Sequence, residues 1–291
     1  MREKTPVSGQ RSAGASPAAA LVRRHDRDRY QTALFAPAAR REALFALYAF
    51  NYEIARLREI VTQPTLGRIR LEWWRENIVA CYNGGPVRRH PVVQALAFTI
   101  RERGLARAHF DRLIDAREAD FDVEPPATLA CLEGYAEGTS STLILLALEV
   151  LGVFEPAAAV AARHVGIAYA LAGLLRALPV LLASGRPVIP VGLAACTGLD
   201  RQDVASLRGT PAVREAAAEI AAAARDRLRA ARTMGRAIRR QALPALLPAV
   251  VAEHFLSRLS RAGHDPFAPG LARPDPLQSW RLAAAALRNR F

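Results

Sequence analysis

Residues 38–61, AARREALFALYAFNYEIARLREIV, decide the fold class of this chain. Large side chains recur at spacings of three and four, which is the period of an α-helix. The residues on this stripe are Leu44, Leu47, Tyr48, Asn51, Ala55 and Arg58. Pro37 stands directly before the stretch, at a place where a helix tolerates its missing N–H. The pattern predicts a long helix with one buried face.

The same periodicity continues along the rest of the chain, and prolines and glycines divide it into further helices. These are expected at residues 66–83, 91–104, 105–122, 127–152, 156–185, 211–240, 243–262 and 276–290, with a turn-rich interval at 185–200. No Asn-Gly or Asp-Gly hairpin signal occurs, and the β-branched runs are too short for a sheet. The sequence therefore predicts an all-α protein of about ten helices.

The composition is that of a folded globular protein, with 51% hydrophobic and 23% charged residues among 291. Residues 1–22 are polar and rich in small side chains, and they lack the apolar core of a secretory signal. We expect them to form a disordered tail before a single helical domain at 23–291. A mitochondrial presequence is the alternative, and Glu3 argues against it.

Residues 165–183, VGIAYALAGLLRALPVLLA, are long enough to cross a membrane. Arg176 and Pro179 lie inside this stretch, and an arginine at the centre of a span costs about 2.5–3.5 kcal/mol on insertion scales. We therefore predict a buried core helix rather than a membrane span.

The formal net charge of +13 favours contact with anionic surfaces. Five arginines at spacings of four, three, four and three predict one basic stripe: Arg225, Arg229, Arg232, Arg236 and Arg239. Such a stripe fits anionic lipid or an acidic partner protein, and a solvated helix face is the alternative. Nucleic acid is not expected as a partner, because aromatic residues make up only 7% of the chain and no binding motif occurs.

Neither the cysteines nor the histidines form a metal-binding motif. Cys81, Cys131 and Cys196 lie far apart, and the six histidines include no HExxH pair. The densest acids occur in IDAREADFD, residues 114–122, and a salt-bridged or solvated helix face explains them without a metal. Trp73 and Trp74 are expected to pack mainly in the core, with a membrane or partner patch as the alternative.

Three blocks resemble the squalene/phytoene synthase family: LFAPAARREALFALYAF at 34–50, YAEGTSSTLILLALEVLG at 135–152 and LAGLLRALPVLLASGRPVIP at 171–190. The likeness extends over about residues 26–265. It implies the isoprenoid synthase fold, an all-α bundle around a large central cavity. Active members of the family join two prenyl diphosphates head to head.

The resemblance also implies where the acidic motifs of active members would fall. Those motifs hold Mg²⁺ on the diphosphate, and Mg²⁺ requires oxygen ligands in octahedral geometry. Aligned on Tyr-Ala-Phe, the first motif falls on Ala55, Arg56 and Glu59. Aligned on Leu-Arg and Gly-Arg, the second falls on Gly173, Ala177 and Leu181, all of which lack a carboxylate.

Both motifs are therefore expected to be degenerate, so no catalytic residue, metal site or cofactor is assigned. Magnesium is expected only if the chain is an active prenyltransferase after all. Arg56, Arg58 and Arg176 are candidate anion-binding residues, since guanidinium groups bind phosphate or carboxylate without a metal. The alternative is that they form ion pairs with Glu53 and Glu59.

The likeness is greater to a non-catalytic branch of the family, which includes a mitochondrial complex I assembly factor and its bacterial relatives. It implies a pseudoenzyme whose partners are respiratory complex I subunits or assembly proteins. The expected place is the bacterial cytoplasm, peripheral to the inner membrane, or the matrix side of a mitochondrion. Two alternatives stay open: an active prenyl-diphosphate transferase, and a metal-free protein that binds an anionic lipid or an isoprenoid.

Overall fold

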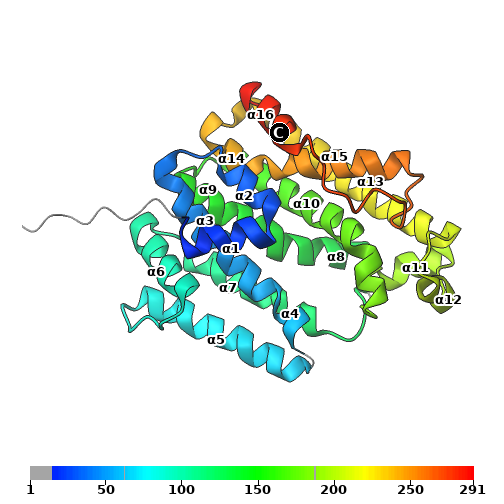
Figure 1. The fold of residues 1–291 in the computed structure, drawn as a ribbon, viewed down its shortest axis with the longest axis horizontal. Helices are drawn as coiled ribbons and strands as arrows, with labels where there is room; N and C mark the ends of the chain where they lie inside the picture. The colour runs from blue at the N-terminus through cyan, green and yellow to red at the C-terminus, as the bar shows by residue number, and fades with distance from the viewer. Residues whose placement is uncertain (1–14, 62, 187) are drawn as a thin grey trace, which may run out of the picture.

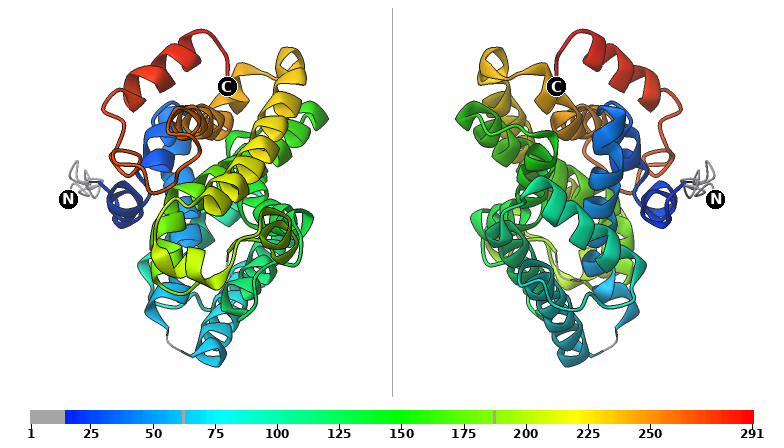
Figure 2. Two further views of the ribbon diagram at one scale, coloured as in Figure 1. Left: turned by 90° about the vertical axis from the view of Figure 1, so that its right-hand side faces the viewer. Right: turned by 90° about the vertical axis from the view of Figure 1, so that its left-hand side faces the viewer.

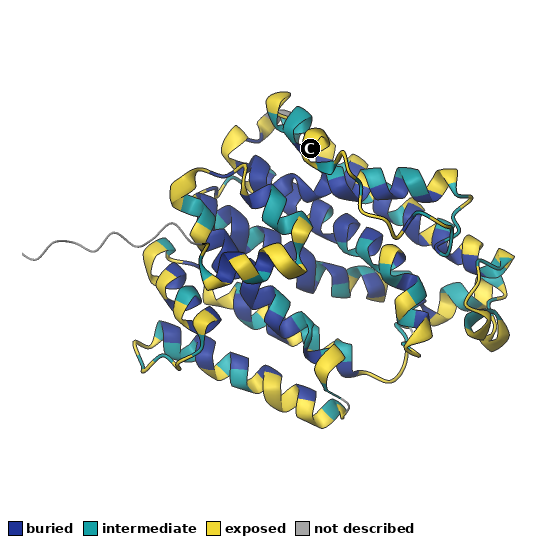
Figure 3. Cartoon of the chain, viewed as in Figure 1, coloured by how far each residue is buried: buried dark blue, intermediate teal, exposed yellow. Residues whose placement is uncertain are grey.

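The structure is a computed structural model that describes residues 15–61, 63–186 and 188–291, without the side chain of Arg236. Within these ranges every regular element is helical and no strand occurs. The all-α prediction is confirmed. Buried residues follow the inner faces of the helices at the centre of the molecule, and exposed residues cover its rim (Figure 3).

The α-helices are α1 (Pro17–His25), α2 (Arg27–Ala33), α3 (Ala38–Ala55), α4 (Leu57–Ile60), α5 (Pro64–Tyr82), α6 (Pro91–Arg103), α7 (Arg107–Arg117), α8 (Leu129–Ala136), α9 (Thr142–Leu151), α10 (Pro156–Ala183), α11 (Val191–Thr197), α12 (Arg201–Ser206), α13 (Pro211–Thr233), α14 (Leu243–Leu246), α15 (Pro248–Arg261) and α16 (Gln278–Leu287). Short 3₁₀ turns are η1 (Glu118–Phe121), η3 (Gly235–Ala237) and η4 (Arg240–Ala242), and η2 (Glu137–Ser141) is a π-helix.

The helix α10 lies at the centre of the bundle (Figure 1). It packs most extensively against α13, and also against α15, α9 and η2, while α3 packs against α1, α6 and α9. By length and composition α10 is apolar enough to cross a membrane, as is the bent pair Arg240–Leu246 and Pro248–Arg261. In the most apolar 18-residue stretch of α10, 56% of the residues are buried inside the bundle. The helix therefore packs as the predicted core helix.

The predicted stripe on α3 is buried over Leu44, Leu47, Tyr48 and Asn51, as expected. The helix itself ends at Ala55, so the predicted helix 38–61 is interrupted before the short α4. Trp74 is buried, and Trp73 packs partly buried against the same core. The prediction of core packing for this pair is confirmed.

The prediction of a disordered tail at 1–22 is wrong at its C-terminal end. Residues from Pro17 onward form α1, which Ser16 caps by accepting a hydrogen bond from the Ala19 N–H at 3.1 Å. Ala18, Ala19 and Val22 are buried against the core. Small residues suggested disorder, but their size is what lets α1 pack closely on α3. Residues 1–14 lie outside the described residues.

The turn-rich interval also differs from expectation, because it contains α11, and α12 follows directly after it. Both helices are short and bury none of their residues in full, so they show no apolar stripe in the sequence. Asp200 and Asp203 form a reciprocal capping box that starts α12.

The predicted helix 127–152 consists of α8, η2 and α9. Its π-helical part, η2, lies very close to α10. A Cβ at Gly166 would lie 2.3 Å from the Ser141 Cα, a backbone atom that cannot rotate away. On the same helix, a Cβ at Gly173 would meet no atom within 4 Å. Only the first glycine is required by packing.

We therefore expect Gly166→Ala to lower the free energy of unfolding by about 2–3 kcal/mol, because overpacking forces the two helices apart. Gly173→Ala is the matched control on the same helix, and it should raise the free energy of unfolding by up to about 1 kcal/mol through helix propensity. Urea denaturation followed by circular dichroism measures both. Equal stability of the two variants would contradict the close approach.

Candidate functional site

The residues predicted to form the first degenerate motif lie where α3 ends and on α4. The Arg56 guanidinium forms an ion pair with the Glu53 carboxylate at 2.8 Å and lies 5.4 Å from the centre of the Tyr52 ring. The other contact of Tyr52 is His25 of α1, whose ring stacks at 4.5 Å. The expected alternative, an ion pair between Arg56 and Glu53, is therefore confirmed, and the cation is held on its own helix.

The remaining acid of this motif, Glu59, is exposed on α4. Arg58 stands beside it in the sequence and is half-buried. Within the described part of the chain, neither residue has an ion-pair partner within 4.0 Å. Neither of the pairs expected for Arg58 is thus present.

The residues predicted to form the second degenerate motif lie on one face of α10. Gly173, Ala177 and Leu181 are spaced by four residues and are all half-buried. Space beside Gly173 is open, since a Cβ there would meet nothing within 4 Å. None of the three side chains carries an oxygen.

These residues do not fit a magnesium cluster. Mg²⁺ is held by carboxylate and phosphate oxygens, and a nearby guanidinium repels it. Of the two motifs only Glu59 offers a carboxylate, and Arg56 lies three residues before it. In the ranges that the structure describes, no group of three or more His, Cys, Asp or Glu side chains could hold a metal ion.

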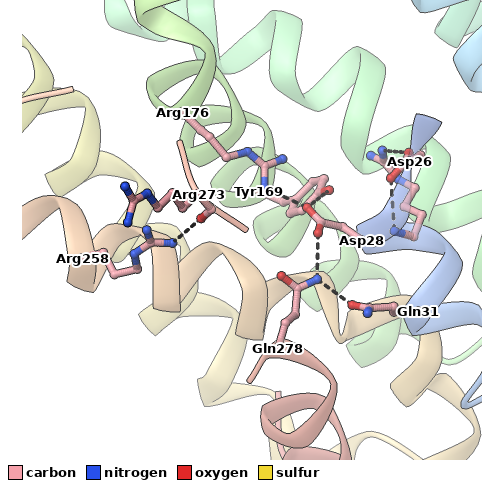
Figure 4. A network of polar contacts seen from close by, with 9 residues as sticks. Asp26, Asp28, Gln31, Tyr169, Arg176, Arg258, Arg273 and Gln278 are labelled. Atoms are coloured by element: carbon pink, nitrogen blue, oxygen red, sulfur yellow. Dashed lines mark hydrogen bonds and ion pairs between the residues drawn. The ribbon is translucent and has the colours of Figure 1, made fainter. Parts of the chain in front are cut away.

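Arg176, the one basic residue retained from the second motif, is tied to the N-terminal helices instead. Its Nη1 donates to the Asp28 Oδ2 at 2.9 Å, so the expected pairing with Glu53 or Glu59 is wrong for this residue (Figure 4). Asp28 also accepts from the Tyr169 hydroxyl at 3.2 Å and from the Gln278 amide at 2.7 Å. Burial opposes ionisation of Asp28, but Arg176 and these hydrogen bonds outweigh it, and the pKa of the carboxyl lies below its ordinary value.

A second arginine, Arg29, lies between α3 and α10. It pairs with the Asp26 carboxylate at 2.7 Å. Its Cζ is 4.9 Å from the Tyr169 ring centre and 6.0 Å from that of Tyr48. Burial disfavours the charge of Arg29, yet Asp26 more than compensates, so the pKa of Arg29 is raised. Burial likewise raises the pKa of the Tyr48 and Tyr169 hydroxyls, which stay protonated.

A third arginine, Arg117, extends this buried polar network to α7 and α8. Its guanidinium donates to Asn51 of α3 at 3.4 Å, to Tyr135 at 2.9 Å and to Asp120 at 3.2 Å. Tyr135 donates in turn to Asp120 at 2.6 Å. The charged groups between α3 and α10 are therefore mutually paired.

The acidic block at 114–122 is salt-bridged, as expected. Arg75 binds Asp115 at 2.7 Å and Glu118 at 3.2 Å, and Arg68 lies 3.5 Å from Asp122. The acids of this block hold α7 and η1 onto α5.

The predicted basic stripe is engaged in contacts within the molecule. Arg225 donates to the Leu256 carbonyl at 2.8 Å, and Arg229 pairs with Asp226. Arg232 pairs with Glu253, and Arg239 with Glu155 at 2.8 Å. The stripe also ends earlier than predicted, because α13 stops at Thr233; the Arg236 side chain lies outside the described residues. The cationic face expected here is largely neutralised.

Beside Asp28 and Arg176 lies a pocket of about 310 Å³, bounded by α2, α10, α15 and the segment before α16 (Figure 4). Its charged lining residues are the basic Arg27, Arg176, Arg258 and Arg273 and the acidic Asp26, Asp28 and Asp275. Apolar atoms come from Val251, Phe255 and Leu271. The four guanidinium groups outnumber the three carboxylates, and Asp28 already pairs with Arg176. The remaining guanidinium groups and the apolar wall can accommodate an anionic group attached to a hydrocarbon chain.

The sequence-based prediction identified Arg176 but missed the residues that surround it. Asp26, Arg27, Asp28 and Arg29 are four charged residues in a row, and such a run ordinarily indicates a solvated face. Only the packing of α2 between α3 and α10 buries two of them in contacts with tyrosines. The sequence signal for these residues was this run of charged side chains, which stands shortly before the block at 34–50.

Comparison with known proteins agrees with this architecture. The chain is 32% identical to a Bos taurus protein named NADH dehydrogenase (ubiquinone) complex I, assembly factor 6, over 271 residues covering 93% of this chain and 81% of that protein. It is 32% identical to the Drosophila melanogaster homolog of that factor, covering 100% of this chain and 89% of that one.

A solved structure of a dehydrosqualene synthase in complex with ligand superposes with a TM-score of 0.79 and 19% identity, covering 93% of this chain and 94% of that one. This likeness confirms the predicted isoprenoid synthase fold. The model of the squalene/phytoene synthase family matches residues 22–285. With that match over most of its length, the chain belongs to the squalene/phytoene synthase family.

Proposed function

We propose that this protein is a non-catalytic member of its family that acts in the assembly of respiratory complex I at the membrane. The observation that carries the proposal is the pair of degenerate motifs: Ala55, Arg56, Ala177 and Leu181 offer no oxygen to a metal. The names of the relatives that match over most of the chain support the assembly role. Partners are complex I subunits or assembly proteins, met at the cytoplasmic side of a bacterial inner membrane or the matrix side of a mitochondrial one.

Deletion of the gene tests the proposal. We expect the abundance of complex I on native gels and the NADH:quinone oxidoreductase activity of membranes to fall, and the wild-type gene to restore both. Glu59→Gln should restore them equally, because Glu59 is exposed and holds no metal in a scaffold. Complex I levels that stay unchanged after deletion would contradict the assembly role.

The enzymatic alternative is tested separately with purified protein. Incubation with farnesyl or geranylgeranyl diphosphate and Mg²⁺ is expected to give no product, and a condensation product that disappears in Glu59→Gln would establish the transferase instead.

A second candidate function is metal-free binding of an anionic lipid or isoprenoid, and the pocket lined by Arg27, Arg176, Arg258 and Arg273 favours it. Native mass spectrometry of the purified protein is the direct measurement. A co-purifying lipid that is lost in Arg176→Ala supports this function, whereas a protein free of lipid in both forms supports a scaffold without a ligand.

A further inference from the structure

The last helix, α16, presents an apolar face that no part of the described chain covers. Leu277, Trp280 and Leu287 are 52%, 75% and 79% exposed. Their spacings of three and seven residues place them on one face together with Ala284. Leu282 lies on the opposite side and is fully buried against the bundle. In both views of Figure 2 this helix lies at the outer edge of the molecule.

Several polar contacts fix the orientation of this face. The Gln278 amide donates to Asp28 at 2.7 Å and to Gln31 at 2.8 Å, and Gln31 donates to Ser279 at 3.0 Å. At the other end, Arg232 donates to the Phe291 carbonyl at 2.9 Å. The apolar face therefore belongs to an anchored helix and not to a frayed end.

The contact with Gln31 also brings the end of α2 beside α16. Leu34 and Phe35 follow Gln31 by three and four residues, and both side chains are exposed. Two further large exposed apolar side chains thus follow, within four residues, a residue that contacts α16.

The charged side chains within this segment are all basic. Residues 276–291 contain no Asp or Glu and three arginines, Arg281, Arg288 and Arg290. Arg281 pairs with Asp275 at 2.9 Å, whereas no described carboxylate lies within 4.0 Å of Arg288 or Arg290. This differs from the basic stripe of α13, whose arginines bind Asp226, Glu253 and a backbone carbonyl.

We propose that α16 docks on the surface of an anionic lipid bilayer, with Trp280 and Leu287 at the boundary between head groups and acyl chains. A short helix with a narrow apolar face and flanking arginines lies in the interface plane. Tryptophan prefers that boundary because one part of its ring system is apolar and its N–H is polar. Arg288 and Arg290 then contact lipid phosphates. The inference rests on the proposed membrane association and supplies its contact surface.

Co-sedimentation with vesicles tests the docking. Purified full-length protein is mixed with vesicles of phosphatidylcholine alone or with added phosphatidylglycerol. We expect binding to the anionic vesicles, and a blue shift of the fluorescence of Trp280, the exposed one of three tryptophans. Trp280→Ala with Leu287→Ala should weaken binding at least about tenfold. The matched control is Phe98→Ala, which removes an exposed aromatic ring on α6 and should bind as wild type.

The charge is tested by a second pair of variants. Arg288→Ala with Arg290→Ala should weaken binding to anionic vesicles about tenfold. Arg201→Ala with Arg208→Ala makes the same change in net charge near α12, at another part of the surface, and should have little effect. Circular dichroism confirms that each variant is folded.

Absence of binding to anionic vesicles, or equal binding by the α16 variants and the controls, would overturn the inference. The α16 variants could fail to restore complex I although the wild-type protein does not bind vesicles. That result would mean that the apolar face binds a protein partner, and the inference would again be wrong. Vesicle binding is measured without complex I. A protein that binds vesicles, but whose deletion leaves complex I intact, refutes the assembly role and leaves the docking surface standing.

Discussion

Arg29→Met is expected to lower the free energy of unfolding by about 3 kcal/mol, because it leaves the Asp26 carboxylate without its partner in a buried site. Both side chains are largely buried, at 12% and 14% exposure. Methionine is close to arginine in length and fills most of the same space. The loss of stability therefore measures the contribution of the charge and not that of packing. The Arg29 guanidinium also lies near the faces of Tyr48 and Tyr169, and these contacts vanish with it.

Urea denaturation at neutral pH measures the change, and Arg27→Met is the matched control. Arg27 lies two residues earlier on the same helix and is exposed, so its replacement should change the free energy of unfolding by no more than about 0.5 kcal/mol. Two variants of equal stability would show that Arg29 is not held between α3 and α10 in the folded protein.

Arg29 also lies between two of the helices that carry the predicted motifs. The resemblance places the motifs of active members at the end of α3, on α4 and on α10. Arg29 lies between α3 and α10, near the rings of Tyr48 and Tyr169. Arg29 is paired with Asp26, and Arg56 is paired with Glu53, so each guanidinium is balanced by a carboxylate. The scarcity of carboxylates at the predicted motif positions remains the support for the proposed non-catalytic role.

The periodic pattern of the sequence was sufficient to predict most of the helices that build the core, although it missed α1 and α2. Pro91 and Gly104 mark the bounds of α6 closely, and Gly104 has the positive φ of 63° that a helix end requires. Pro156 starts α10 in the same way. These signals are local, so they can be recognised without knowledge of the neighbours.

Features that depend on neighbours were not predictable in this way. The π-helix η2 lies where Ser141 meets Gly166 of another helix. The small polar residues at 139–142 are compatible with close helix packing, but they do not identify the partner helix. The partner of Arg176 is Asp28, 148 residues away. An arginine-rich sequence offers many equivalent partners to each acid, and only the fold selects one.

Arg117→Met is expected to have an effect of similar size, about 3 kcal/mol of lost stability, since Arg117 links three helices through one guanidinium. It reaches Asn51 on α3, Tyr135 on α8 and Asp120 in η1. Burial disfavours its charge, but Tyr135 and Asp120 raise the pKa of Arg117 above its ordinary value. Without it, Asp120 keeps a charge that only the Tyr135 hydroxyl contacts.

A double-mutant cycle with Asp120→Asn separates the charge pair from packing. The asparagine still accepts the Tyr135 hydroxyl, but it leaves no unpaired carboxylate when Arg117 is replaced. We expect the double variant to be more stable than Arg117→Met alone, with a coupling energy of about 1–3 kcal/mol. Strictly additive effects would mean that Arg117 and Asp120 do not interact. Arg117 would then stabilise the protein through packing and through its hydrogen bonds to Asn51 and Tyr135, without a contribution from the charge pair.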